Sequence, residues 1–230
     1  MEKIKEFLKK LGSKRALTTI VCIIIAIALT VGGIMGLAAG IRHARAVVTC
    51  DDVTIEENTV RYLASYYKML YIHGLIDRGI EVTDTPEFWA SSDSDGRSFG
   101  DKLVSGFKDY IVFLAAASSV YETEIGYKWK DKVFVAEKCE EVLLKTEGGS
   151  VASFNDDVAE YGFDYNDFQR ASVLIYKAGR TAEAVAGMSH PELAELQEAA
   201  TSRVTFAEGF SNVDILTVPT LADFYVKSFV

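Results

Sequence analysis

Residues 17–41 read LTTIVCIIIAIALTVGGIMGLAAGI, a run of 25 residues without a charged side chain. A helix of this length, at about 1.5 Å per residue, is long enough to cross the ~30 Å hydrocarbon core of a bilayer. This run divides the chain into three parts. The sequence predicts a basic tail over residues 1–16, a single transmembrane helix over residues 17–41 and one larger domain over residues 47–230.

The charges beside this run indicate its orientation. Six basic residues precede it, whereas only Arg42 and Arg45 follow it closely. Because basic flanks are retained in the cytoplasm, we expect a cytoplasmic N-terminus and an extracytoplasmic main domain. A cleaved secretory signal is the alternative, since Ala44-Arg45-Ala46 resembles a cleavage site. The apolar run exceeds the ~7–15 residues usual in such signals, so we expect an uncleaved anchor.

The composition of the exterior part limits its partners. Residues 46–230 hold 16 basic and 31 acidic residues, against eight basic and two acidic residues before them. An acidic exterior repels phosphate, so nucleic acid is excluded as an expected partner. The exterior has no Asn-x-Ser/Thr acceptor, and a bacterial cell surface is the simplest location.

Cysteine usage does not indicate a disulfide framework. Cys22 lies in the predicted membrane span, Cys50 lies just beyond it and Cys139 falls in a helical pattern. A Cys50–Cys139 bridge stays open as an alternative.

Hydrophobic periodicity predicts a mainly α exterior. Apolar residues recur at helical spacing in several segments that end at glycines or begin at capping residues such as Ser150 and Asp164. Short β segments are expected near the start of the domain and near its C-terminus. The expected helices cover residues 56–77, 101–124, 129–146, 151–161, 164–186 and 192–200, and the expected β segments cover residues 47–55, 204–206 and 213–218.

Residues 78–100 have the composition of a polar loop in which Phe88 and Trp89 pack against the body. Within this loop, residues 91–96 (SSDSDG) are similar in spacing to an EF-hand calcium loop. Ser91 at the first position and Lys102 at the twelfth do not supply the carboxylates that such a loop needs. We therefore expect no metal site and no cofactor.

The order of parts resembles the N-terminal helical domain of SurA-type and PrsA-type extracytoplasmic chaperones. The similar passages are TIEENTVRYLASYYKMLYI at residues 54–72, FWASSDSDGRSFGDKL at residues 88–103 and GGSVASFNDDVAEYGFDYNDFQRASVLIY at residues 148–176. The resemblance covers about 170 residues and implies a domain that binds unfolded or partly folded exported proteins. Members of the family often continue into a parvulin prolyl isomerase domain of roughly 90 residues. No such domain fits between residue 203 and residue 230, so we expect no isomerase activity.

The first exterior helix carries a group of aromatic side chains that are candidates for client binding. Tyrosine and methionine offer a large, adaptable amphipathic surface for varied apolar segments. Packing of the same helix inside the core of the domain is the alternative. The candidate residues are Tyr62, Tyr66, Tyr67, Met69 and Tyr71.

Three glycines repeat every fourth residue in the predicted membrane span. Gly32, Gly36 and Gly40 would form one helix face that a second helix could approach closely. This spacing would allow a homodimer in the membrane, but we favour ordinary use of glycine in membrane helices.

The sequence therefore predicts a membrane-anchored, extracytoplasmic protein that is similar to SurA and PrsA and binds unfolded polypeptides without catalysis. The alternative is a structural or assembly subunit that uses the same helical domain to hold one partner in a surface complex.

Overall fold

The computed structural model describes residues 45–146, 148–187 and 190–221. The predicted span over residues 17–41, with Gly32, Gly36 and Gly40, lies outside the described residues. All that follows concerns the compact unit that begins at Ala46.

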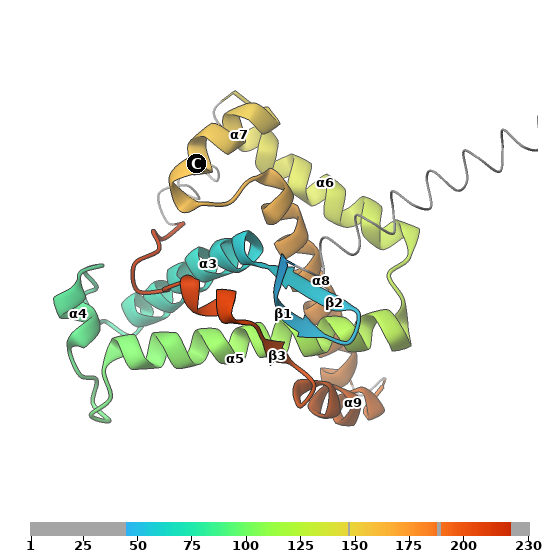
Figure 1. Cartoon of the computed structure of the whole chain (residues 1–230), viewed down its shortest axis with the longest axis horizontal. Coiled ribbons are helices and arrows are strands. Elements are labelled where there is room, and N and C mark those ends of the chain that lie inside the picture. Colours follow the sequence, from blue (N-terminus) through green and yellow to red (C-terminus); the bar gives the residue numbers. More distant parts are fainter. Residues whose placement is uncertain (1–44, 147, 188–189, 222–230) are drawn as a thin grey trace, which may run out of the picture. The chain divides into compact units, whose positions relative to one another are not determined.

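The unit is mainly helical, with one small sheet (Figure 1). This confirms the fold class predicted from hydrophobic periodicity, including short strands near the start and the C-terminus of the domain. Three long helices, α3 (Glu57–Asp77), α5 (Phe99–Val120) and α8 (Tyr165–Ala186), pack against one another and form the centre of the unit.

The sheet has the strand order β2-β1-β3, with antiparallel neighbours. Strands β1 (Ala46–Cys50) and β2 (Val53–Glu56) form a hairpin around the Asp51-Asp52 turn, and β3 (Thr205–Phe206) adds to the other edge of β1. The hairpin packs on α5, and Val48 and Ile55 are fully buried. The small sheet therefore extends the helical core.

Helix α5 is the most central element. It packs on α3, α8 and α9 (Glu192–Thr201), and a π-helical turn (Tyr121–Ile125) follows it. Among the described residues, the stretch Phe99–Ile125 is long and apolar enough to cross a membrane, but 56% of its most apolar window is buried inside the domain. Its apolar character matches its place in the core.

The remaining helices lie around this centre. Helix α6 (Trp129–Lys145) packs along α8. The short α7 (Val151–Val158) and a 3-10 turn (Ala159–Tyr161) lead into the start of α8. The short α4 (Pro86–Ala90) lies beside the start of α5 (Figure 1). Its Trp89 is buried, as predicted for the polar loop between α3 and α5.

Local signals account for several helix boundaries. The Ser150 side chain accepts a hydrogen bond from the Ser153 amide. Asp164 and Asp167 cap α8 reciprocally, each accepting from the other's backbone N–H. Gly162 has a φ of +75°, a left-handed conformation that glycine adopts without steric cost, and the chain reverses there between the 3-10 turn and α8.

Two predictions are corrected. Residues 213–218 form no strand: a 3-10 turn (Glu208–Asn212) precedes them, and residues 215–217 form a turn. Cys50 and Cys139 are both free and buried, so the alternative of a bridge between them is wrong.

Candidate functional site

The five residues predicted to bind clients lie in or against the core. Tyr62 and Met69 are buried, at 2% and 6% exposure, and the other three tyrosines pack partly buried against the core cluster. Tyr62 contacts Phe163 and Phe168 edge-on, with ring centroids 5.2 and 5.5 Å apart. Tyr62 and Met69 therefore pack inward, as the alternative interpretation had it, whereas Tyr66, Tyr67 and Tyr71 keep partly exposed side chains. Client binding by these residues stays a prediction.

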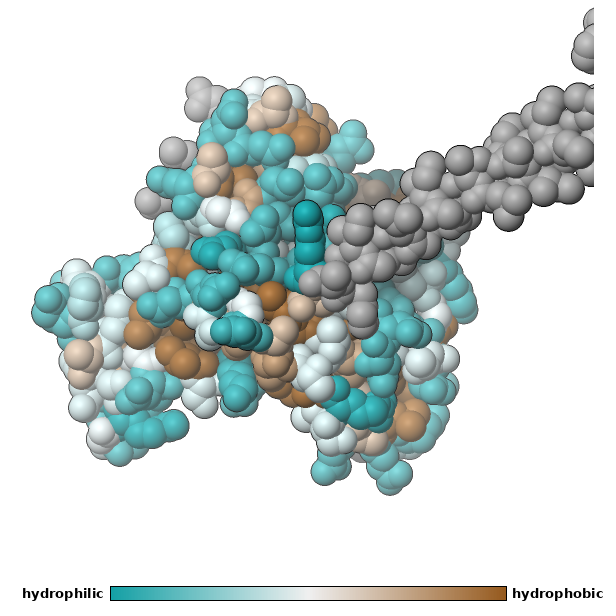
Figure 2. Space-filling model, in the orientation of Figure 1, coloured by the Kyte–Doolittle hydropathy of each residue, from teal (hydrophilic) through white to brown (hydrophobic). Residues whose placement is uncertain are grey.

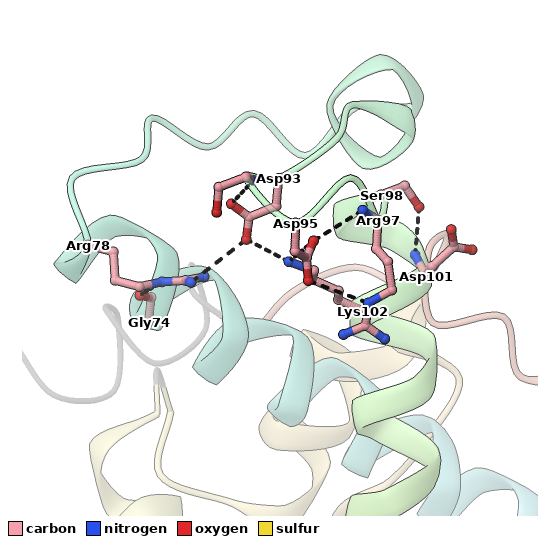
Figure 3. A network of polar contacts seen from close by, with 9 residues as sticks. Gly74, Arg78, Asp93, Asp95, Arg97, Ser98, Asp101 and Lys102 are labelled. Atoms are coloured by element: carbon pink, nitrogen blue, oxygen red, sulfur yellow. Dashed lines mark hydrogen bonds and ion pairs between the residues drawn. The ribbon is translucent and has the colours of Figure 1, made fainter.

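The residues that resemble a calcium loop bind a cation of the protein itself (Figure 3). The Lys102 ammonium lies 2.8 Å from an Asp93 carboxylate oxygen and 2.7 Å from one of Asp95. These hydrogen bonds from Lys102 hold the pKa of Asp93 at about 2, well below its usual value. The lysine at the twelfth position thus supplies the positive charge that a bound metal would supply in an EF-hand. Among the described residues no cluster of three metal-ligating side chains occurs.

A groove of about 720 Å³ lies between α4, the first turns of α5 and the chain after the last 3-10 turn. Apolar side chains from α4, α5 and the chain after the last 3-10 turn line the groove. Three carboxylates and one lysine also line it. Figure 2 shows apolar surface over this part of α5 and the neighbouring C-terminal chain, with hydrophilic residues beside it. The apolar lining residues are Pro86, Trp89, Ala90, Val104 and Leu216, and the charged ones are Asp84, Asp101, Lys108 and Asp214.

The groove is open to solvent at its apolar side. Val104, in the second turn of α5, is an apolar side chain that is 46% exposed. A second cavity of about 730 Å³ borders the π-helical turn and α9, and charged residues such as Glu124, Arg180 and Glu183 line much of it. The groove beside Val104 is therefore the site better suited to apolar ligands.

A buried lysine lies next to the groove. Lys68 on α3 is 1% exposed, and its ammonium donates to the carbonyl oxygens of Leu216 and Val218, both at 3.0 Å. It also lies 2.8 Å from a carboxylate oxygen of Asp84 and over the ring of Trp89, 5.4 Å from the centroid. Three acceptors and an aromatic face compensate for the water that the ammonium loses on burial.

Trp89 connects this lysine with the groove. Its indole Nε1 donates to the same Asp84 oxygen at 2.7 Å, and the residue also lines the groove. The position of Trp89 is fixed further by Phe88, which contacts it edge-on at 5.0 Å and stacks on Phe99 at 5.0 Å. The carboxylate of Asp84 thus joins Trp89 and Lys68 beside the groove.

The sequence reasoning identified Trp89 as a packing residue but missed Lys68, Asp84 and Leu216. A signal was present, because Lys68 follows Ala64 and Ser65 by one helical turn on the stripe that α3 buries. A cation on such a stripe needs acceptors from another element, and only the folded chain shows that residues 216 and 218 supply them.

The described thiols do not suit nucleophilic chemistry. Burial is the largest effect that raises the pKa of Cys50 and of Cys139 above the ordinary value of a thiol. A thiol with a raised pKa has less of the reactive thiolate.

Comparison of the chain with protein-family models, with curated proteins and with solved structures found no match.

Proposed function

We propose that this chain is a membrane-anchored extracytoplasmic protein that binds apolar segments of unfolded or partly folded exported polypeptides in the groove between α4 and α5. The observation that carries the proposal is the open apolar groove of about 720 Å³ beside a buried lysine that binds backbone carbonyls. An apolar surface selects apolar side chains, and carbonyl groups are common to all polypeptides, so this combination suits clients of varied sequence.

The sequence supports the location of this activity. The uncharged run over residues 17–41 and its basic flank favour an anchor with a cytoplasmic N-terminus. The resemblance to SurA-type and PrsA-type domains favours a chaperone that holds its clients without catalysis. Protease added to right-side-out vesicles should digest the chain after residue 47 and leave the N-terminal tail protected. Protection of the large domain until the bilayer is opened would contradict the orientation.

The holding activity is tested with the full chain in lipid nanodiscs. It should slow the aggregation of several unrelated denatured exported proteins at near-equal molar ratio. Val104→Asp places a charge in the groove and should abolish this effect. Leu196→Asp is the matched control, because Leu196 is similarly exposed, at 40%, and lies on α9 away from the groove. If Val104→Asp and Leu196→Asp slow client aggregation equally well, the groove is not the client-binding site.

An assembly subunit is the second candidate. Trp129 is 78% exposed at the start of α6, and Phe134 on the same helix is 47% exposed. Large exposed aromatic side chains on one helix are typical of a contact with a fixed partner. Crosslinking in intact cells separates the two functions. A single partner trapped through Trp129 favours the assembly subunit, and many unrelated exported chains trapped through Val104 favour the chaperone.

A further inference from the structure

Residues 213–221, here called the strap, belong to no helix or strand and carry both buried and exposed side chains. Four apolar side chains of the strap are 8% exposed or less, and one of them is fully buried. These side chains point into the body of the domain, although they come from irregular chain. They are Val213, Ile215, Val218 and Leu221.

The strap satisfies its own backbone donors locally. The amides of Thr217 and Val218 both donate to the carbonyl oxygen of Asp214, at 3.1 Å, and the amide of Leu216 donates to the Asp214 carboxylate at 3.0 Å. The next residue, Pro219, has no amide hydrogen. These bonds do not depend on the body of the domain, so the strap can leave the body without breaking them.

The body holds the strap as a protein holds a bound peptide. Lys68 donates to two carbonyl oxygens that are two residues apart, those of Leu216 and Val218. The side chains of Ile215 and Val218 fill apolar positions in the core. Binding of backbone carbonyls combined with apolar positions for side chains is a general mode of peptide recognition. Here the two apolar positions are three residues apart, one at the start of the turn at residues 215–217 and one directly after it.

The strap also forms one side of the groove. Leu216 and Thr217 line it opposite Val104, and the site of Leu216 also adjoins the start of α5, because a Cβ added at Gly100 would lie 3.4 Å from its side chain. Displacement of the strap would expose the ammonium of Lys68, which now binds the carbonyl oxygens of Leu216 and Val218, to the groove.

We propose that the strap occupies, within its own chain, a binding site for an apolar polypeptide segment that forms a turn, and that a client segment exchanges with it. The client would present two carbonyl groups to Lys68 and apolar side chains to the positions of Ile215 and Val218. This inference rests on the proposed function and adds the identity of the ligand, an apolar turn recognised through its backbone carbonyls. The strap then sets the affinity, because only the fraction of molecules with a displaced strap can bind.

The test uses a fluorescent peptide with the sequence of the strap, VDILTVPTL, and the full chain in nanodiscs. The peptide should bind and should raise hydrogen exchange at the amides of residues 213–221. A peptide with serine in place of its four buried apolar residues should do neither. Val218→Ser in the protein weakens the strap and should raise the affinity for the peptide about tenfold, since more molecules have an open site.

Val135→Ser is the matched control for this substitution. Val135 on α6 is as buried as Val218, at 6% exposure, and its replacement should lower stability without changing the affinity for the peptide. Equal affinities for the peptide in Val218→Ser, Val135→Ser and the unaltered protein would overturn the proposal. The proposal would also be overturned if the strap peptide bound no more tightly than the peptide with four serines.

The outcome for the strap is separate from the outcome for the proposed function. Aggregation of clients that slows while the strap amides keep their protection would overturn the exchange and leave client binding in the groove intact. Binding of the strap peptide without any effect on client aggregation would support the exchange and contradict the chaperone function.

Discussion

The guanidinium of Arg203 binds both carboxylate oxygens of Asp51, with Nε–Oδ1 and Nη2–Oδ2 distances of 2.8 and 2.9 Å. The hydroxyl of Ser119 on α5 donates to the same carboxylate at 2.5 Å. Asp51 forms the tip of the first hairpin and has a φ of +51°. One side chain therefore joins the hairpin to α5 and to the chain after α9.

This pair predicts a pH dependence of stability. The hydrogen bond from Arg203, followed by that from Ser119, lowers the pKa of Asp51 to about 2. The pKa of Asp51 is lower in the folded protein than in the unfolded chain. The unfolded chain therefore binds more protons as the pH falls from about 5 towards 2. The stabilisation is complete above about pH 5 and is lost as the pH falls towards 2.

Asp51→Asn keeps a residue that tolerates positive φ and removes the charge. It should lower the free energy of unfolding by roughly 1 kcal/mol at pH 7, a value that allows for solvent screening of this partly exposed pair. The difference should vanish near pH 2 in urea unfolding measurements. Glu183→Gln breaks the exposed pair with Arg180 and should change stability by less than about 0.5 kcal/mol at either pH. An Asp51→Asn effect that is independent of pH would contradict the prediction.

Lys68→Met removes the buried ammonium but keeps most of its volume. The carbonyl oxygens of Leu216 and Val218 lose their common donor, so the variant should lose about 2–3 kcal/mol of stability. Lys138→Met is the control, because Lys138 and its partner Glu141 are both more than half exposed, and it should cost less than about 0.5 kcal/mol. Chemical denaturation measures both variants, and an unchanged midpoint for Lys68→Met would show that the ammonium does not hold the strap.

Two tyrosines should respond in opposite ways to the same substitution. The hydroxyl of Tyr71 is buried without a hydrogen-bond partner among the described residues, whereas that of Tyr176 donates to Asp131 at 2.9 Å. Tyr71→Phe should therefore leave stability unchanged or raise it by up to about 1 kcal/mol, and Tyr176→Phe should lower it by about 1–2 kcal/mol. Thermal unfolding followed by circular dichroism compares them. Equal losses in the two variants would mean that Tyr71 has a partner, such as a buried water.

Tyr62→Ser tests the inward packing of the tyrosine-rich helix. Tyr62 is 2% exposed and contacts Phe163 and Phe168, so its truncation should cost on the order of 3–5 kcal/mol. Phe134→Ser, at a position 47% exposed, should cost much less. If the Tyr62→Ser protein had normal stability but no longer bound clients, α3 would be part of the client-binding site.

Much of the helical framework could be predicted because its signals are local. The Ser150 cap, the reciprocal Asp164 and Asp167 cap and the reversal at Gly162 each involve residues that are close in sequence. Such contacts form in the same way wherever the segment lies in the fold. The single β segment predicted over residues 47–55 is divided by a turn at Asp51 and Asp52 into β1 and β2.

Residues 213–218 show where this reasoning fails. Their β-branched composition fits a strand, but a strand needs an edge with which to pair, and β3 contributes only the two residues Thr205 and Phe206 to its edge of the sheet. The apolar side chains of this segment are instead buried in the hydrophobic core of the domain. Local composition thus predicted a β segment, and only the fold shows that this segment turns and packs its apolar side chains into the core.

The sequence by itself determined the uncharged run of residues 17–41, the acidic composition of residues 46–230 and the succession of helices, because periodicity and charge are properties of neighbouring residues. Only the tertiary structure decided which polar groups meet across long separations. Lys68 meets the carbonyls of residues 216 and 218, and Asp51 meets Ser119 and Arg203. Burial makes the partners of Lys68 necessary, since an unpaired charge in the core is costly. The sequence pattern does not say which distant residue will supply the partner.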